Sequence, residues 1–159
     1  MNLIQGELNY REDLKIGLVT SRFNQEITER LETCALKRLA DLGFKESQLV
    51  VTRVPGALEI PFAVQALLRH GCDGVVALGA VIRGETSHYD YVCAGAERGC
   101  SHLQIKYKKP VAFGVLTTEN EEQALARSGG DKCDKGAEAV DVVIELIDLM
   151  KKLKENKNT

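Results

Sequence analysis

The chain has 159 residues, of which 44% are hydrophobic and 28% charged, and its formal net charge is −2. This balance is typical of one globular domain spanning residues 1–159, and the interspersed charges leave no basic stripe that would indicate a nucleic-acid partner. Since no stretch approaches the roughly 18 uninterrupted apolar residues of a membrane span, and the first four residues do not resemble a signal peptide, we expect a cytoplasmic protein without a membrane partner.

The first predicted element is a strand that stands apart from the others. Residues 2–8 are followed by a charged, turn-rich segment at 9–13, which separates them from the first core strand at 15–20. A detached strand of this kind adds to the edge of a sheet, in its own subunit or in a neighbour. We therefore expect residues 1–13 to form an N-terminal strand and linker, with the strand added to a neighbouring subunit.

Two helices surround the next strand. The first runs from Asn24, which we expect to cap it, to Gly43, and most of its charged residues, Glu32 among them, are expected to lie off its apolar stripe. After a strand at 49–54, the second helix carries Pro61 in its first turn, where the missing N–H is harmless. Its segment 62–68 is apolar almost all round, which indicates cover on more than one side, as a subunit contact provides.

The strand at 75–82 is an uncharged apolar run, typical of a strand buried on both faces of a parallel sheet. A glycine turn at Gly84 leads into a helix that extends to about Ile105. The first N–H groups of such a helix lack partners and, with the helix dipole, favour an anion such as phosphate. His88 lies beside this position, and imidazole, with an unperturbed pKa of about 6.5, both gives and takes protons near neutral pH. The plainer reading is a simple turn followed by a surface histidine.

The remaining chain continues the alternation of strands and helices. A strand at 111–116, a short helix to about Arg127 and a final helix follow, and the polar tail at 152–159 is expected to fray. This alternation predicts an α/β fold, a flavodoxin-like three-layer α/β/α sandwich with a parallel sheet. Ligands of such sheets bind outside the carboxyl ends of the strands.

Those strand ends carry chemically useful side chains. They are two aromatic rings, Phe23 and Phe113, a carboxylate, Glu59, and two cations past the last strand, Arg127 and Lys135. Together with the histidine they suit a flat polar heterocycle bound beside a phosphorylated small molecule. Each also has a plainer reading, as a core ring, a carboxylate at a helix start or a surface charge.

Metal and nucleotide sites are not indicated. Five cysteines, an odd number without a C-x-x-C pair, predict neither a disulfide framework nor a zinc site, and three histidines are too scattered to suggest a metal. Dinucleotide-binding, P-loop and G-x-S-x-G motifs are missing from the sequence. General acid–base chemistry and positioning remain.

Six segments in register resemble the 6,7-dimethyl-8-ribityllumazine synthase family, over about residues 1–151. They are SRFN (21–24), VPGALEIP (54–61), LGAVIRGETSHYDYV (78–92), FGVLTTEN (113–120), QALARSGG (123–130) and KGAEA (135–139). The resemblance implies an enzyme of riboflavin biosynthesis that joins 5-amino-6-(D-ribitylamino)uracil to 3,4-dihydroxy-2-butanone 4-phosphate, releasing phosphate and water, without a metal or organic cofactor.

The resemblance also implies roles for individual residues. His88 is the proton shuttle, Phe23 stacks on the pyrimidine, and Arg127 pairs with the phosphate. The amides of Glu85 and Thr86 also bind the phosphate. The pyrimidine edge and the ribityl chain are held by Ala57, Leu58, Glu59, Ala80, Val81 and Ile82.

A further implication is that Phe113, Arg127 and Lys135 come from a neighbouring subunit of a homopentamer. In many members twelve pentamers form a 60-subunit shell, and riboflavin synthase is a candidate partner. Because the acidic linker Asp131–Asp134 contains no insertion of the kind that accompanies free pentamers, we expect a shell. Leu58 stands where the family often has an aromatic residue, which implies a looser ribityl subsite, and Glu85 places a carboxylate in the phosphate loop, where its side chain must point away.

Two other functions remain open from the sequence. The chain could be a flavin- or lumazine-binding protein of the same fold without turnover, in which the histidine and the arginine have no task. It could also be a related enzyme, such as the archaeal type of riboflavin synthase, which accepts two lumazines.

Overall fold

The computed structural model describes residues 1–129 and 134–157. Four parallel strands form one sheet in the order β2-β1-β3-β4. The elements in chain order are β1 (Ile16–Ser21), α1 (Gln25–Asp41), the 3-10 helix η1 (Glu46–Gln48), β2 (Leu49–Val54), the 3-10 helix η2 (Ala57–Glu59), α2 (Ile60–Arg69), β3 (Gly74–Ile82), α3 (His88–Tyr107), β4 (Val111–Thr118), α4 (Glu121–Arg127) and α5 (Lys135–Asn156). No helix in these ranges combines the length and apolar character that a membrane crossing requires.

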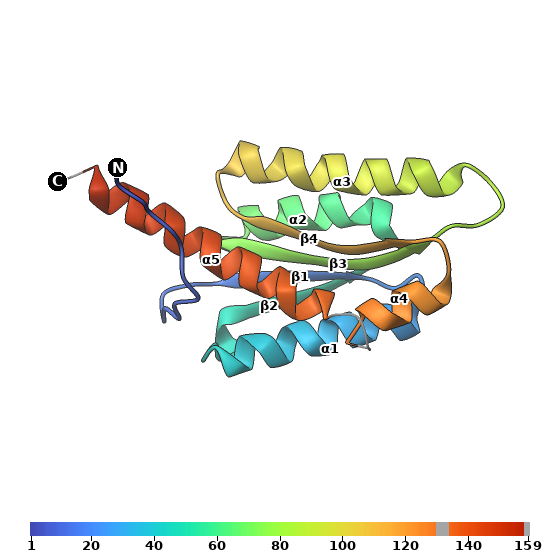
Figure 1. Cartoon of the computed structure of the whole chain (residues 1–159), viewed down its shortest axis with the longest axis horizontal. Coiled ribbons are helices and arrows are strands. Elements are labelled where there is room, and N and C mark those ends of the chain that lie inside the picture. Colours follow the sequence, from blue (N-terminus) through green and yellow to red (C-terminus); the bar gives the residue numbers. More distant parts are fainter. Residues whose placement is uncertain (130–133, 158–159) are drawn as a thin grey trace.

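Helices cover both faces of the sheet, so the predicted three-layer sandwich is confirmed. Helices α2 and α3 lie on one face, and α1, α4 and α5 on the other (Figure 1). Strand β3 shows why both faces are apolar, since side chains alternate along a strand. Val76 and Leu78 join the core under α1 and α5, whereas Val75 and Ala77 join the core under α2 and α3.

The strand register aligns the carboxyl ends at one edge of the molecule. Ser21 pairs with Val54, and Ile82 pairs with Thr118. The backbone continues these pairings by one residue, because the Arg22 N–H donates to the Val54 carbonyl at 2.8 Å and the Arg83 N–H to the Thr118 carbonyl at 2.9 Å. The loops that follow the four strands therefore emerge side by side.

The first ten residues have no regular secondary structure and run along α5. The Glu7 N–H donates to the Asp148 carboxylate at 2.8 Å, and Lys152 Nζ donates to the Gln5 carbonyl at 3.0 Å. Within residues 1–129 and 134–157 the segment pairs with no strand, and its addition to a neighbour stays a prediction. The partners in these contacts, Asp148 and Lys152, belong to α5. This helix continues to Asn156, so it includes most of the tail at 152–159 that was expected to fray.

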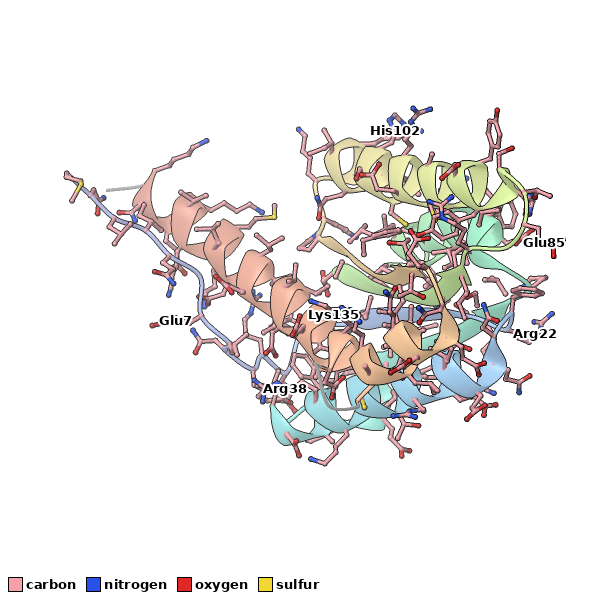
Figure 2. The ribbon with its side chains drawn as sticks, turned by 45° about the vertical axis from the view of Figure 1, so that its right-hand side comes forward. Glu7, Arg22, Arg38, Glu85, His102 and Lys135 are labelled. Carbon is pink, nitrogen blue, oxygen red and sulfur yellow. The ribbon has the colours of Figure 1, made fainter. Side chains whose placement is uncertain are left out.

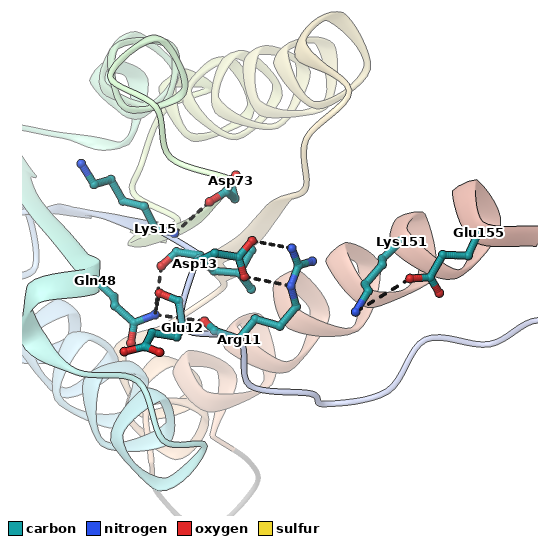
Figure 3. Close-up of polar contacts among 9 residues, drawn as sticks. Arg11, Glu12, Asp13, Lys15, Gln48, Asp73, Lys151 and Glu155 are labelled. Atoms are coloured by element: carbon teal, nitrogen blue, oxygen red, sulfur yellow. Dashed lines mark hydrogen bonds and ion pairs between the residues drawn. The ribbon is translucent and has the colours of Figure 1, made fainter.

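The linker before β1 is held by side chains rather than by strand pairing (Figure 3). Gln48 Nε2 donates to the carbonyls of Arg11 at 3.1 Å and Leu14 at 3.0 Å. The Lys15 N–H donates to the Asp73 carboxylate at 2.8 Å. These bonds satisfy backbone groups that no strand or helix would satisfy.

Asn24 is the N-cap residue of α1, as predicted, and its carbonyl accepts from the N–H groups of Ile27 at 3.0 Å and Thr28 at 3.1 Å. Its side chain makes no capping hydrogen bond, however, and its backbone is left-handed, with φ 60° and ψ 50°. Asparagine tolerates this conformation better than most residues. Its Nδ2 instead donates to the Ala80 carbonyl at 3.0 Å, so it joins the loop after β1 to the end of β3.

Glu32 on α1, which was expected to lie off the apolar stripe, is buried. Glu32 is 5% exposed and lies under β2. Arg53 on that strand donates two hydrogen bonds to the Glu32 carboxylate, at 3.2 and 2.5 Å. Burial is the largest single influence on the pKa of this carboxyl and would alone raise it, but the hydrogen bonds and charge of Arg53 together with the Thr20 hydroxyl outweigh burial and hold the pKa below its ordinary value. A helical pattern read from sequence does not reveal a cation on a neighbouring strand.

Replacing Arg53 with methionine is expected to lower the free energy of unfolding at pH 7 by about 1–2 kcal/mol, less than for a fully buried pair because the Arg53 side chain is 57% exposed. A carboxyl whose pKa is lower in the folded state stabilises the fold above its unfolded value and loses that contribution as the pH falls through its folded value. The loss should therefore shrink below about pH 4.5, the ordinary value of the group.

Urea unfolding of both proteins at neutral and acidic pH measures this difference. The exposed pair Lys37–Asp41 supplies the control, because Lys37→Met should change stability by no more than about 0.5 kcal/mol. An equal loss for Arg53→Met at both pH values would show that lost packing of the arginine stem, and not the ion pair, is responsible.

Candidate active site

A cavity of about 630 Å³ lies at the carboxyl ends of β1, β2 and β3. Most of the residues predicted to bind substrate or move protons line it. The lining residues are Phe23, Pro55, Gly56, Ala57, Leu58, Glu59, Ala80, Val81, Ile82, Gly84, Thr86, His88, Tyr89 and Val92. We call it the first cavity.

Phe23 lies at the rim of the first cavity and not in the core. Its ring is carried by a residue that is 73% exposed, which excludes the plainer reading of a core aromatic. The Phe23 N–H donates to the Pro55 carbonyl at 3.0 Å, and this bond fixes the loop after β1 against the end of β2. The backbone of Phe23 is therefore fixed at the rim, and the exposed ring has a face available for stacking on a flat ligand.

The 3-10 turn Ala57–Glu59 forms another wall. The turn is closed by the Glu59 N–H, which donates to the Gly56 carbonyl at 3.2 Å. An added Cβ at Gly56 would lie 3.0 Å from Glu59 Oε2, so glycine leaves room for the carboxylate. Leu58 is 48% exposed in this turn, and its side chain borders the cavity.

The loop from Gly84 to Ser87 carries the predicted anion site. His88 is the first residue of α3 and is exposed, and its N–H lies 3.4 Å from Thr86 Oγ1. Within the described residues the amides of Glu85 and Thr86 have no hydrogen-bond acceptor. The Glu85 side chain lies at the edge of the molecule and does not line the first cavity, in keeping with a backbone role for this residue (Figure 2).

Arg83 holds this loop, a role that no sequence motif predicted. Its Nε donates to Glu119 at 2.8 Å, its Nη1 to Asp90 at 3.4 Å, and its guanidinium lies 4.3 Å from the centre of the Tyr89 ring. The pKa of Arg83 is raised, chiefly by the hydrogen bond to Glu119. Tyr89 also lines the first cavity and was not predicted. The partner Glu119 lies in another loop, 36 residues further along the chain, so this charge pair could have been found only from the fold.

A second cavity of about 440 Å³ lies along β4 and the facing ends of α4 and α5. It is lined by Phe113, Arg127 and Lys135, the three residues predicted to come from a neighbouring subunit. Arg127 Nη1 donates to the Gln123 carbonyl at 2.9 Å, and Lys135 Nζ lies 2.8 Å from Glu138. Within one chain these residues do not line the first cavity.

Residues suited to a metal ion do not gather in either place. In the described ranges no three His, Cys, Asp or Glu side chains form a group that could hold a metal ion. Their four cysteines are free thiols, and Cys133 lies outside these ranges. Residues 131–133 of the acidic linker Asp131–Asp134 also lie outside these ranges, whereas the Asp134 side chain accepts from the Ala137 N–H at 3.0 Å and caps α5.

The residues that line both cavities lie in a range that matches known proteins. A model of the 6,7-dimethyl-8-ribityllumazine synthase family matches residues 13–151. The chain belongs to this family. A lumazine synthase from Bdellovibrio bacteriovorus is 56% identical over 140 residues, which are 88% of this chain and 77% of the relative. Lumazine synthases from Helicobacter pylori and Helicobacter hepaticus are 46% and 47% identical over 155 and 154 residues, 97% and 96% of this chain and 99% of each relative.

The lumazine synthase match includes every residue predicted for the site. Leu58 and Glu85, the departures noted in the sequence, lie inside the matched range 13–151. Residues 1–12 and 152–159 lie outside it, and the former contain the whole segment that runs along α5.

Proposed function

We propose that the chain condenses 5-amino-6-(D-ribitylamino)uracil with 3,4-dihydroxy-2-butanone 4-phosphate, giving 6,7-dimethyl-8-ribityllumazine, phosphate and water. Family membership supports the reaction. The observation that carries it to this chain is the first cavity, which places an exposed ring, a carboxylate and an imidazole around one space. A flat heterocycle with a polyol chain and a reacting amine needs these three groups.

In this proposal the pyrimidine stacks on Phe23. Backbone groups at the end of β3 bind its polar edge, and the Glu59 carboxylate accepts hydrogen bonds from the ribityl hydroxyls. The ordered end of β3 supports the assignment, because Asn24 Nδ2 fixes the Ala80 carbonyl from the opposite loop. The pyrimidine residues are Ala80, Val81 and Ile82, and the ribityl residues are Ala57, Leu58 and Glu59.

The second substrate places its phosphate at the start of α3. The amides of Glu85 and Thr86 and the guanidinium of Arg127 bind it, and the arginine does so bidentately. The amine of the pyrimidine attacks the ketone and water leaves. Phosphate is then eliminated, and attack of the ribitylamino nitrogen on the remaining carbonyl closes the second ring and releases a second water. His88 takes and returns the protons in these steps.

We further propose that one active site needs two subunits. The first cavity of one chain would meet Phe113, Arg127 and Lys135 of a neighbour in a homopentamer, and twelve pentamers would form a shell. Large exposed apolar side chains on α2 and α3 support subunit contacts, with Phe62 80%, Tyr91 74% and Ile105 75% exposed. In such an assembly the segment 2–8 would pair with a neighbouring sheet, and the enzyme would act in the cytosol, with riboflavin synthase as partner.

An assay with both substrates tests the reaction. The purified chain should form fluorescent 6,7-dimethyl-8-ribityllumazine only when the pyrimidine and the butanone phosphate are both present. Riboflavin or lumazine binding without turnover would instead indicate the binding protein of the same fold. Turnover of lumazine alone, with inertness toward the butanone phosphate, would indicate a riboflavin synthase. Light-scattering mass then distinguishes a monomer, a pentamer and a shell.

A further inference from the structure

Helix α3 carries two glycines one turn apart where it meets the start of α2. A Cβ added at Gly95 would lie 2.6 Å from Leu58 Cδ2, and one added at Gly99 would lie 2.5 Å from Pro61 Cβ. Contacts this short do not occur between real side chains. Positions four residues apart share one face of a helix, so the two glycines form a continuous notch.

The notch determines where the turn Ala57–Glu59 lies. Leu58 enters it at one end and Pro61 at the other, and Glu59 lies between these two contacts. The hydrogen bond from the Glu59 N–H to the Gly56 carbonyl is local to the turn and does not fix its distance from α3. Packing against the glycines must therefore set how far the turn projects into the first cavity.

The two contacts differ in how they can yield. Leu58 Cδ2 is the end of a flexible, half-exposed side chain that borders the first cavity. Pro61 belongs to a rigid ring in the first turn of α2, next to Ile60, which is fully buried. Added volume at Gly95 would displace a side chain into the cavity, whereas added volume at Gly99 would displace a helix.

We propose that Gly95 is a specificity-determining residue that keeps Leu58 out of the space for the polyol chain of the substrate, while Gly99 positions the turn. The proposal rests on the proposed function. It assigns to α3 a second task, apart from carrying the histidine at its start. The task is to set the width of the ribityl subsite from behind, through a residue that touches no substrate.

Gly95→Ala tests this assignment. The variant should raise KM for the ribitylaminouracil about tenfold while leaving KM for the butanone phosphate and kcat within about twofold. Riboflavin, measured by fluorescence quenching, should bind more weakly by a similar factor, because it carries the same chain. Alanine favours a helix more than glycine does, so the unfolding temperature of Gly95→Ala should not fall below that of the wild type.

The double variant Leu58→Ala, Gly95→Ala is the decisive control. Without Leu58 Cδ2 the added methyl meets nothing, so Gly95→Ala should have no effect on KM or on riboflavin binding in the Leu58→Ala background. An equal effect in both backgrounds, or none in the wild type, would overturn the proposal. Gly99→Ala should instead lower the unfolding temperature, since the ring cannot yield.

Failure of the proposed function would look different. In that case the wild-type chain forms no lumazine from the two substrates, whatever residue occupies position 95. An active wild type with an unresponsive Gly95→Ala variant rejects the notch alone.

Discussion

Replacing Arg127 with methionine is expected to lower kcat/KM for the butanone phosphate by about a hundredfold, mainly through KM. Its guanidinium is held in the second cavity by the Gln123 carbonyl of its own helix, so the group is oriented before a phosphate arrives. Methionine keeps much of the apolar stem and removes the charge and the fork of donors. Steady-state kinetics with each substrate varied in turn measure the change.

Arg69→Met is the matched control. Arg69 is exposed at the last turn of α2, at the end of the sheet opposite the cavities, and its loss should leave kcat/KM within about twofold. If Arg127→Met weakened riboflavin binding as strongly as it weakened use of the butanone phosphate, a specific role in binding phosphate would be contradicted.

Replacing His88 with alanine is expected to lower kcat about a hundredfold with little change in either KM, since general acid–base catalysis contributes on this scale. The reaction should not stop, because holding two substrates together supplies rate without proton transfer. Because His88 is exposed at the start of α3, the variant should keep the wild-type fold, and circular dichroism checks this.

Mixing the two variants tests whether one site uses two chains. If the first cavity works with the second cavity of a neighbour, equal amounts of His88→Ala and Arg127→Met chains, unfolded and refolded together, should recover about one quarter of wild-type activity. Each site then has an even chance of an intact half from either side. Variants refolded separately and then assayed together provide the control. Lack of recovery would place both halves in one chain.

The fold could be predicted because its core strands are marked by composition. The apolar run expected at 75–82 became β3, Gly74–Ile82, and the strand at 49–54 was found with the same bounds. What the sequence did not reveal depends on contacts distant in sequence. Glu32 of α1 is buried because Arg53 on β2 lies beside it, and the Asn24 side chain makes no capping bond because it donates to the Ala80 carbonyl.

The site could be predicted in part for the same reason. The rule that ligands bind at the carboxyl ends of parallel strands selects Phe23, Glu59 and His88, and the structure brings these three to one cavity. The rule does not reveal the role of Arg83, whose partner Glu119 lies in another loop. Nor does it reveal the glycine notch, which depends on how closely two helices approach each other. The periodicity of apolar residues in a sequence indicates which face of a helix or strand is buried. It does not indicate how closely another helix or strand approaches that face.

The path of the first ten residues along α5 has a practical consequence. Met1 lies beside the last turns of α5, at the end of the molecule remote from the loops that bear the cavities (Figure 1). An affinity handle or a fluorescent reporter joined ahead of Met1 should emerge next to one joined behind the helix. Both should leave turnover intact, and energy transfer between a donor and an acceptor so placed would report the detachment of this segment.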